Sequence, residues 1–496
     1  MSASKKSGTK AFILVASKII TLLLSMLTAI VLARTLSLEE YGTYSELLTV
    51  SSIGVSIFSL GLPNALNYFL PKAANEEEKN RFIAFYFAIV TLLSLVLMGV
   101  MAFANKAISD YYDNERLITY SYFLIIIPWT KLLISSRSNL LIAEGKVLRE
   151  IIYCIANGSL LALIGLLTLT DYANFDIYII LYVITECVFA LLVYLEAFLA
   201  SKKKIAIRID RAKILELIKY TVPLGLSTAI STISLDLDKL IIGNLMDESS
   251  VAIYANAGKE LPFSLIPTAF TAIFLPQMVA LVKNKNINAA VSRWKDIMVI
   301  NYILLAFCAS ASIVFAPQII SLLYSPAYLD GVTIFRIYSL TLILRITYWA
   351  MILNAFGKIQ EILLNSIACL LINAILSVLS YKVIGFAGPA LATLISILAI
   401  VIFQIVRTSK LINVPMRQII PLREFILPSL VSLLSGLGVF AIVNYIGLGI
   451  DTGGIIWAIL MGLVWGVLYL VVFAKKIKKL WKNLNVDILE SNSKEG

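Results

Sequence analysis

The sequence predicts an all-α polytopic membrane protein, and two observations carry this prediction. Of the 496 residues, 60% are hydrophobic and only 14% are charged, with a mean hydropathy of +0.91, whereas soluble domains carry about 25% charged residues. Apolar runs long enough to cross a bilayer core of about 30 Å as helices recur along the whole chain. We expect about 14 transmembrane helices, at residues 11–33, 43–69, 82–104, 117–142, 148–169, 176–200, 214–245, 251–282, 297–323, 332–356, 360–383, 386–406, 421–446 and 453–474.

The distribution of positive charge predicts the topology. With both termini in the cytoplasm, the exterior connectors hold only Arg34, Lys106, Arg116 and Lys382, while most of the 41 Lys and Arg residues fall on the cytoplasmic side. This is the asymmetry that multi-pass membrane proteins show. It accounts for the net charge of +11 without a nucleic-acid partner, and we expect the Lys-rich tail to lie near anionic lipid headgroups. The first apolar run is also too long for a cleaved signal peptide.

A weak internal repeat predicts the domain organisation. Residues 33–44 (ARTLSLEEYGTY) and 243–254 (GNLMDESSVAIY) each end a long helix, pass an acidic corner and resume at a Tyr. The repeat equates the first and seventh helices, and paired repeats with a site between them are common in transporters. We expect a six-helix lobe at 1–200, a basic cytoplasmic linker at 201–213, a second six-helix lobe at 214–410, two additional helices at 411–474 and a basic cytoplasmic tail at 475–496.

Charged residues inside the expected spans are the candidate site residues, because a charge at the bilayer centre costs about 2.5–3.5 kcal/mol. Lys18 and Lys131 have no acidic partner on their own helix, and Arg336 and Arg345 share a span without any acid. Cations of this kind in several helices predict a cavity that accepts an anion; pairing between helices is the alternative. Arg336 and Arg345 are nine residues apart in one expected span, so we expect them on opposite faces. The predicted cavity cations are Lys18, Lys131, Lys259, Arg336 and Arg345.

Acidic residues and a proline are candidates for coupling or gating. Asp236, Asp238 and Glu186 could serve an ion-coupled transporter, although Asp236 and Lys239 are equally well placed to pair on one helix face. Pro223 removes a backbone hydrogen bond and predicts a bend. Arg137, Glu196, Glu46 and Lys219 lie near helix ends, where we expect their charged groups to reach toward the membrane surface.

The sequence gives no support for catalysis. It has no His, no glycine-rich phosphate loop and no nucleophile–base pair, so we expect no enzyme activity, no cofactor and no metal site. A glycan polymerase or ligase would need a large exterior loop, which the expected connectors do not provide.

Several motifs resemble the polysaccharide flippases, the Wzx-type members of the multidrug/oligosaccharidyl-lipid/polysaccharide exporter superfamily. These are LARTLSLEEYGTY and GLPNALNYFLPKA near the start, the block from Ser231 to Leu281, and LNAFGKIQ at 353–360. The resemblance implies two six-helix lobes of the kind found in multidrug (MATE-like) exporters, placed around a central cavity with alternating access. It implies transport of an undecaprenyl-diphosphate-linked oligosaccharide from the cytoplasmic to the outer leaflet of the cell (plasma or inner) membrane.

The implied partners are the lipid-linked oligosaccharide, membrane lipid and a polysaccharide polymerase. Two alternatives stay open within the same superfamily, a lipid II flippase and a multidrug cation exporter. The exporter would need acidic residues to dominate the cavity, whereas cations lie in at least as many of the expected spans.

Overall fold

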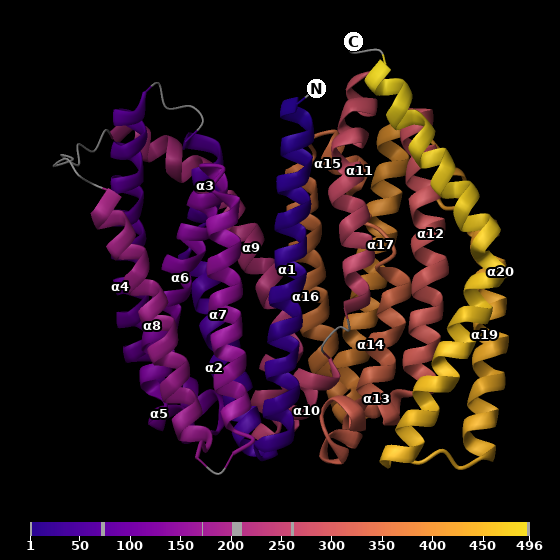
Figure 1. Cartoon of the computed structure of the whole chain (residues 1–496), viewed down its shortest axis with the longest axis horizontal. Coiled ribbons are helices and arrows are strands. Elements are labelled where there is room, and N and C mark those ends of the chain that lie inside the picture. Colours follow the sequence, from indigo (N-terminus) through magenta and orange to yellow (C-terminus); the bar gives the residue numbers. More distant parts are fainter. Residues whose placement is uncertain (1, 71–74, 171, 201–210, 259–261, 494–496) are drawn as a thin grey trace. The chain divides into compact units, whose positions relative to one another are not determined.

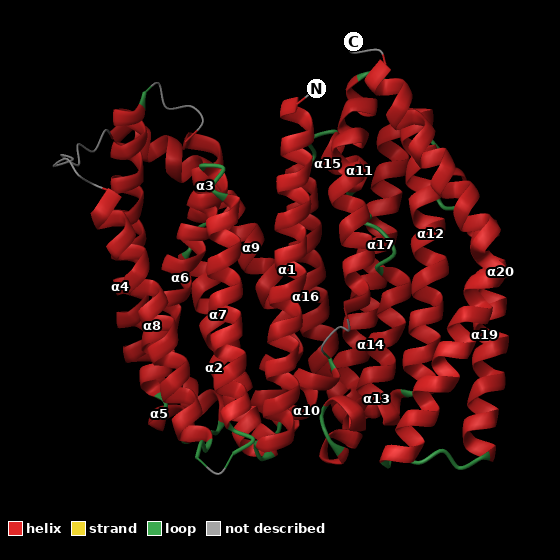
Figure 2. Ribbon diagram, viewed as in Figure 1, coloured by secondary structure: helices red, strands yellow, loops and turns green. Residues whose placement is uncertain are grey.

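The computed structural model describes residues 2–70, 75–170, 172–200, 211–258 and 262–493 (Figure 1); within these ranges it leaves out the side chains of 2–18, 64, 67, 197–200, 211–214, 272 and 485–493. The described part is built of helices joined by short loops and contains no strand (Figure 2). It divides into two compact units, Met1–Ile253 and Tyr254–Gly496. The prediction of an all-α polytopic membrane protein is confirmed.

In the first unit, α6 is the central helix. It packs against α2, α3, α4 and α8, while α1 packs along α7, and α9 runs beside α2. The apolar core between α3, α4, α6 and α8 is closed by Leu66, Tyr86 and Leu132, all fully buried. The helices of this unit are α1 (Ser2–Thr35), α2 (Leu38–Phe58), α3 (Leu62–Phe69), α4 (Glu76–Tyr112), α5 (Arg116–Thr119), α6 (Ser121–Ala143), α7 (Val147–Leu167), α8 (Phe175–Ala200) and α9 (Arg211–Leu245), followed by the start of α10 (Glu248–Ala257).

In the second unit, α12 is central and contacts α11, α14, α19 and α20. Its Trp294 is fully buried in a cluster that also includes Leu484, near the end of α20. The elements after α10 are the 3-10 turn η2 (Pro262–Ser264), α11 (Leu265–Lys283), α12 (Ile287–Val314), α13 (Ala316–Leu323), η3 (Pro326–Gly331), α14 (Val332–Leu344), α15 (Met351–Ala355), α16 (Ile359–Ile384), η4 (Gly385–Ala387), α17 (Gly388–Ile412), α18 (Met416–Ile419), α19 (Leu422–Tyr445) and α20 (Thr452–Ser493).

Every one of the fourteen expected segments contains a helix. Among the described residues, nine stretches are long and apolar enough to cross a membrane; one of them, Ile359–Ile412, holds both α16 and α17, and Ile19–Thr35 of α1 is a shorter apolar stretch.

Five expected segments are not the continuous helices that were predicted; one of them, 117–142, is interrupted at Tyr120 between α5 and α6. The segment 43–69 breaks between α2 and α3, where Gly61 has a positive φ of 70° and Pro63 follows. The segment 251–282 separates into α10 and α11, and 297–323 into α12 and α13, in both cases beside prolines. The segment 332–356 ends its first helix at Leu344 and resumes at Met351.

Side chains of α12 stabilise the break between α14 and α15. Asn301 donates a hydrogen bond to the carbonyl oxygen of Ile346 (2.8 Å), and Trp294 donates to the hydroxyl of Thr347 (2.9 Å). Non-helical backbone is tolerated inside a membrane protein where other protein groups satisfy it. Arg345 is the C-cap residue directly after the last residue of α14, so the expectation that Arg336 and Arg345 occupy opposite faces of one helix stays a prediction.

The internal repeat is visible in the local structure. The helix break at Leu36–Ser37 recurs at Met246–Asp247, 210 residues later. Ser37 and Glu40 form a capping box at the first break. At the second, hydrogen bonds from Ser250 to the Asp247 carboxylate (2.6 and 3.0 Å) hold the pKa of Asp247 below its ordinary value.

Two further signatures recur at nearly the same offset. Asn75 and Asn286 cap the N-termini of α4 and α12. Gly145-Lys146 and Gly357-Lys358 end helices with nearly equal glycine φ angles, 72° and 73°. In both turns the lysine N–H donates to the carbonyl five residues before it, with distances of 2.8 and 2.9 Å. The two halves of the chain therefore share one helical plan.

The first compact unit extends beyond the end of the predicted first lobe. It includes α9, which was assigned to the second lobe, because α9 packs along α2 and also contacts α3 and α4. The predicted boundaries around 201–213 and at 410 follow the repeat and stay predictions.

Gly42 provides a test of the packing in the first unit. A Cβ at this position would lie 1.9 Å from the carbonyl oxygen of Glu248. We expect Gly42→Ala to destabilise the protein by about 1–3 kcal/mol, the usual cost of overpacking, seen as a lower melting temperature of the purified protein. Gly99→Ala is the matched control, because a Cβ there meets no atom within 4 Å. Equal melting temperatures for the two variants would contradict the tight α2–α10 contact.

Candidate functional site

The first unit contains a polar cavity of about 540 Å³ between α2, α6 and α9. On α2, its lining residues recur at the spacing of one helix face. Four of them are serines: Ser52, Ser56 and Ser59 donate to backbone carbonyls of the preceding turn, and the hydroxyl of Ser51 is buried. This face consists of Leu48, Ser51, Ser52, Val55, Ser56 and Ser59.

Helices α6 and α9 complete the wall of the cavity. On α6, Lys131, Ser135 and Asn139 are separated by four residues each and therefore share a face. On α9, Thr228 and Thr232 follow the same spacing. The arrangement brings hydroxyl and amide groups from three helices around one ammonium group, which suits a ligand rich in hydrogen-bonding groups with a negative charge.

Lys131 is anchored by a buried carboxylate. Its Nζ lies 2.8 Å from Glu186 Oε1 of α8, and it lies over the ring of Tyr182 at 5.5 Å from the centroid. Asn157 of α7 also donates to Glu186 Oε1 (3.4 Å). Glu186 is fully buried, while the side chain of Lys131 is 37% exposed. The pair therefore places the Lys131 side chain at the cavity wall with part of its surface accessible. Lys131 is thus paired with a residue of another helix, which was the alternative to an unpaired cavity cation in the sequence analysis.

Asp236 is also paired. It forms an ion pair with Lys239, three residues later on α9, and accepts a hydrogen bond from Ser52 (3.0 Å). This contact links α9 to the serine face of α2. Asp238 is buried, and Pro223 is an exposed residue within α9, which continues to Leu245. Two residues after Pro223, Gly225 touches the turn at Leu60–Gly61, where a Cβ would lie 2.3 Å from the Leu60 carbonyl carbon.

The other predicted cations are not part of this cavity as the structure describes it. Lys18 lies in α1, with a side chain outside the described part, and Lys259 lies outside the described residues. Arg336 and Arg345 belong to the second unit; Arg336 Nε donates to the carbonyl oxygen of Ile313 at 3.1 Å. Lys131 is thus the predicted cation that the structure places in the wall of the polar cavity.

Near the cytoplasmic end expected for α6, Arg137 forms a second ionic cluster. Its guanidinium donates two hydrogen bonds to Glu196 (2.8 and 2.9 Å), lies 3.9 Å from Glu150 and stacks over Tyr153. Arg137 and Glu150 are buried, so the prediction that Arg137 reaches toward the membrane surface is wrong. Glu46 contradicts the same expectation, since it is only 1% exposed. Burial in both cases follows from partners on neighbouring helices.

The serine face of α2 was missed by the sequence analysis. Its signal is present in the chain as serines recurring every three or four residues from 51 to 59. A search for charged residues within apolar spans passes over it, because hydroxyl groups are tolerated in membrane helices and are not exceptional there.

A family model for polysaccharide biosynthesis proteins matches residues 31–333, more than half of the 496 residues. The chain belongs to this family. No curated protein matches the sequence significantly.

Comparison with solved structures identifies the fold of this chain. The chain is similar to the lipid II flippase MurJ in its inward closed conformation, with a TM-score of 0.73, 16% identity, and coverage of 94% of this chain and 100% of that one. It is also similar to the Vibrio cholerae MATE transporter VcmN in the bent form (TM-score 0.53, 13% identity, 85% and 100% coverage). A third match is an outward-facing multidrug resistance MATE family transporter of the MOP superfamily, with a TM-score of 0.53, 15% identity, and coverage of 81% of this chain and 93% of that one.

These matches confirm the fold expected from the resemblance. The chain has the fold of the MOP superfamily and is a multi-pass membrane protein. The proteins it resembles are a flippase and transporters, in agreement with the expectation that the chain is not an enzyme.

The Lys131–Glu186 pair gives a testable stability effect. Lys131→Gln leaves the buried Glu186 without its cation, and we expect a loss of about 3 kcal/mol, the lower end for a broken buried pair because Lys131 is 37% exposed. The double variant Lys131→Gln/Glu186→Gln removes both charges and should recover most of that loss. Thermal unfolding of the purified variants measures both effects. A double variant less stable than the single one would show that the pair does not behave as described.

Proposed function

We propose that this protein is a flippase that moves an undecaprenyl-diphosphate-linked oligosaccharide from the cytoplasmic to the outer leaflet of the inner membrane by alternating access. The polar cavity of the first unit carries this proposal. Sugars cannot enter hydrocarbon without losing their hydrogen bonds, at a cost of several kcal/mol for each unpaired group. The serine and threonine hydroxyl groups offer replacement partners, and Lys131 offers a positive charge to the diphosphate. Family membership and the likeness to a lipid II flippase support the same substrate class.

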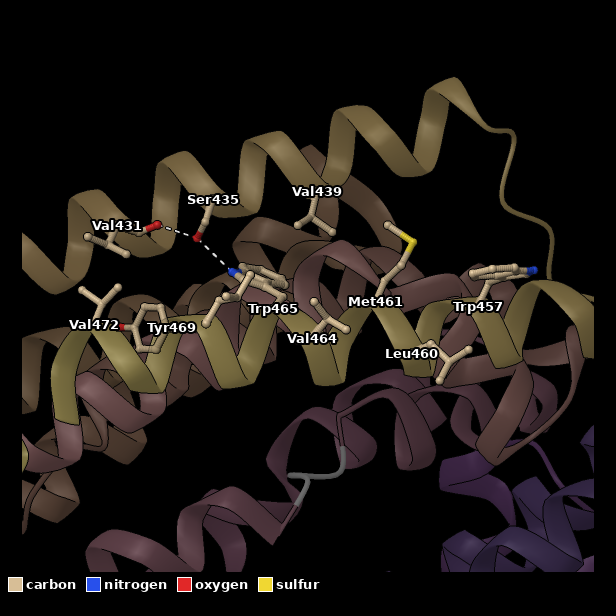
Figure 3. Close-up of a pocket in the computed structure, with 11 residues that line it drawn as sticks. Val431, Ser435, Val439, Trp457, Leu460, Met461, Val464, Trp465, Tyr469 and Val472 are labelled. Carbon is tan, nitrogen blue, oxygen red and sulfur yellow. Dashed lines mark hydrogen bonds between the residues drawn. The ribbon is translucent and has the colours of Figure 1, made fainter.

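An apolar groove in the second unit supports a lipid-linked substrate. It lies between α19 and α20, has a volume of about 510 Å³, and is lined almost wholly by apolar side chains (Figure 3). One polar contact crosses it, from Trp465 Nε1 to Ser435 Oγ at 2.9 Å. Such a groove fits a polyprenyl chain, which stays in an apolar environment while the sugar moves.

Export of cationic drugs is the second candidate, favoured by the likeness to MATE transporters. The charge of the cavity argues against it. Lys131 is the charged residue in the lining, and it would repel a cation. We therefore place the anionic, sugar-bearing substrate first and the lipid II flippase as its nearest variant.

The positive charge of the connectors supports placing both termini in the cytoplasm. With a negative cell interior, outward movement of two negative charges is favourable by about 4.6 kcal/mol per 100 mV. A polysaccharide polymerase that uses the flipped glycan is the partner that we propose for this activity.

Depletion of the protein in its native cells tests the function directly. We expect the lipid-linked glycan to accumulate on the cytoplasmic leaflet, with loss of surface polysaccharide, as measured by its accessibility to a membrane-impermeant sugar-modifying reagent. Lys131→Gln/Glu186→Gln should fail to restore transport at wild-type abundance, because the substrate loses its cation. Unchanged glycan sidedness with new sensitivity to cationic dyes would move the assignment to drug export.

The groove makes a separate prediction. Leu460→Trp and Val464→Trp fill the space between α19 and α20, and we expect each to lower transport severalfold without lowering abundance. Val467→Trp is the control, since Val467 is exposed to a similar extent on α20 but does not line the groove. Equal transport in the three variants, measured by recovery of surface polysaccharide in depleted cells, would exclude the groove as the path of the lipid chain.

A further inference from the structure

Glu46 of α2 is a buried carboxyl group in the first unit with an incomplete set of partners. It is 1% exposed, and its Oε2 accepts a hydrogen bond from Asn114 Nδ2 at 2.7 Å. Its second oxygen, Oε1, is buried and has no hydrogen-bond partner in the structure. The hydroxyl of Tyr112, which interacts electrostatically with Glu46, is also buried and without a hydrogen-bond partner.

The orientation of Asn114 is fixed by its other contacts. Its Oδ1 accepts a hydrogen bond from the backbone N–H of Arg116 (3.0 Å), and its Nδ2 donates to Thr43 Oγ1 (3.0 Å) as well as to Glu46. The amide therefore presents a donor to Oε2 and has no further donor for Oε1. A neutral carboxylic acid, with Oε2 as the carbonyl oxygen and a proton on Oε1, fits this site better than a carboxylate, because it removes the negative charge from a buried group that receives one hydrogen bond.

A second acidic group faces Glu46 across a close helix contact. Gly42 lies one turn before Glu46 on α2 and touches the backbone of Glu248, the first residue of α10. A charge on Glu46 would therefore carry the cost of burial and would also lie near a second carboxylate. Glu248 is half-buried, while Glu46 is enclosed, so Glu46 is the member of the pair that gains more from neutralisation.

The elements around α2 supply no counter-ion to Glu46 in the part of the chain that the structure describes. On α6, Lys131 pairs with Glu186; on α9, Lys239 pairs with Asp236. Arg116 of α5 acts on Glu39, and the hydrogen bond described for the Glu46 carboxyl group comes from a neutral amide, that of Asn114. From α4, the titratable neighbour is Tyr112. A buried carboxylate without a cation costs several kcal/mol, and a proton removes this cost.

We propose that Glu46 is a proton-binding site whose occupancy controls the contact between α2 and the start of α10. With the proton bound, the two helices close at Gly42 and Glu248. Loss of the proton places two negative charges across that contact and opens it to water. Its role as the coupling site of transport rests on the proposed function, whereas proton binding itself does not.

Infrared difference spectroscopy of the full-length protein in phospholipid vesicles, between acidic and alkaline pH, tests proton binding. We expect a carbonyl band of a protonated carboxyl group that is lost in Glu46→Gln and kept in Glu186→Gln, the control for a buried carboxylate with a cation. Asn114→Ala should shift the band to higher frequency, because Asn114 donates to the carbonyl oxygen. A wild-type spectrum without this band, or a band that persists in Glu46→Gln, overturns the proposal.

Cysteine crosslinking tests the effect on the helix contact. Ser249 donates a hydrogen bond to Glu39, so the pair Glu39→Cys/Ser249→Cys reports the distance between the starts of α2 and α10. We expect the crosslinking yield to fall as pH rises when Glu46 is present and to stay constant with Glu46→Gln. The same pH dependence in both backgrounds overturns the switch. If the infrared band is found but glycan sidedness does not depend on this protein, the proposed function fails while the proton site stands.

Discussion

Pairing of buried charges between helices is the constraint on which the first unit depends. An ionised side chain in an apolar span is costly unless a partner on another helix holds it. Lys131 joins α6 to α8, Arg137 joins α6 to both α7 and α8, and the Asp236 pair is tied to α2 through Ser52. These contacts fix the rotation of α6 and α9 about their axes. That rotation, in turn, directs the polar faces of both helices into one cavity.

In the function that we propose, the same contacts that stabilise the first unit also arrange the cavity for its ligand. Glu186 is enclosed and compensates the charge of Lys131, while the partly exposed side chain of Lys131 lines the cavity. An anionic substrate of the kind that we propose would need little reorganisation of these groups on binding. Serine and threonine hydroxyl groups line part of the same cavity, and a hydroxyl group can both accept and donate hydrogen bonds.

Much of the fold could be predicted from composition and helix length, because apolar runs of about 20 residues have few alternatives in a membrane. The positions at which helices break were harder to predict from the sequence. The interruption at 345–350 contains neither Gly nor Pro, and it depends on Asn301 and Trp294, which lie more than forty residues earlier. The partner of Lys131 was also hidden, since Glu186 lies on a different helix and spacing within one helix reveals only local pairs.

The candidate site likewise contains some residues that could be predicted from the sequence and others that could not. Lys131 could be selected from the sequence because a lone cation in an apolar span is conspicuous, but its neighbours Ser51, Ser52 and Thr228 could not, because hydroxyl groups are common on both lipid-facing and buried surfaces. Glu46 was misjudged for a related reason. Its position near the start of α2 predicts access to water, yet Asn114 and Tyr112, brought in by the end of α4, cover it.

The recurring corner at Leu36–Ser37 and Met246–Asp247 has a consequence for how the two halves diverged. The offset between equivalent features grows from 210 residues at this corner to 211 at the capping asparagines and 212 at the Gly-Lys turns. Duplication of a shorter ancestor followed by only two changes in length accounts for this drift. Once the copies were fused in one chain, each could acquire substitutions without imposing them on the other. The two halves differ at this point of the shared plan, since α6 is continuous through residues 133–138, whereas the stretch 212 residues later, 345–350, separates α14 from α15.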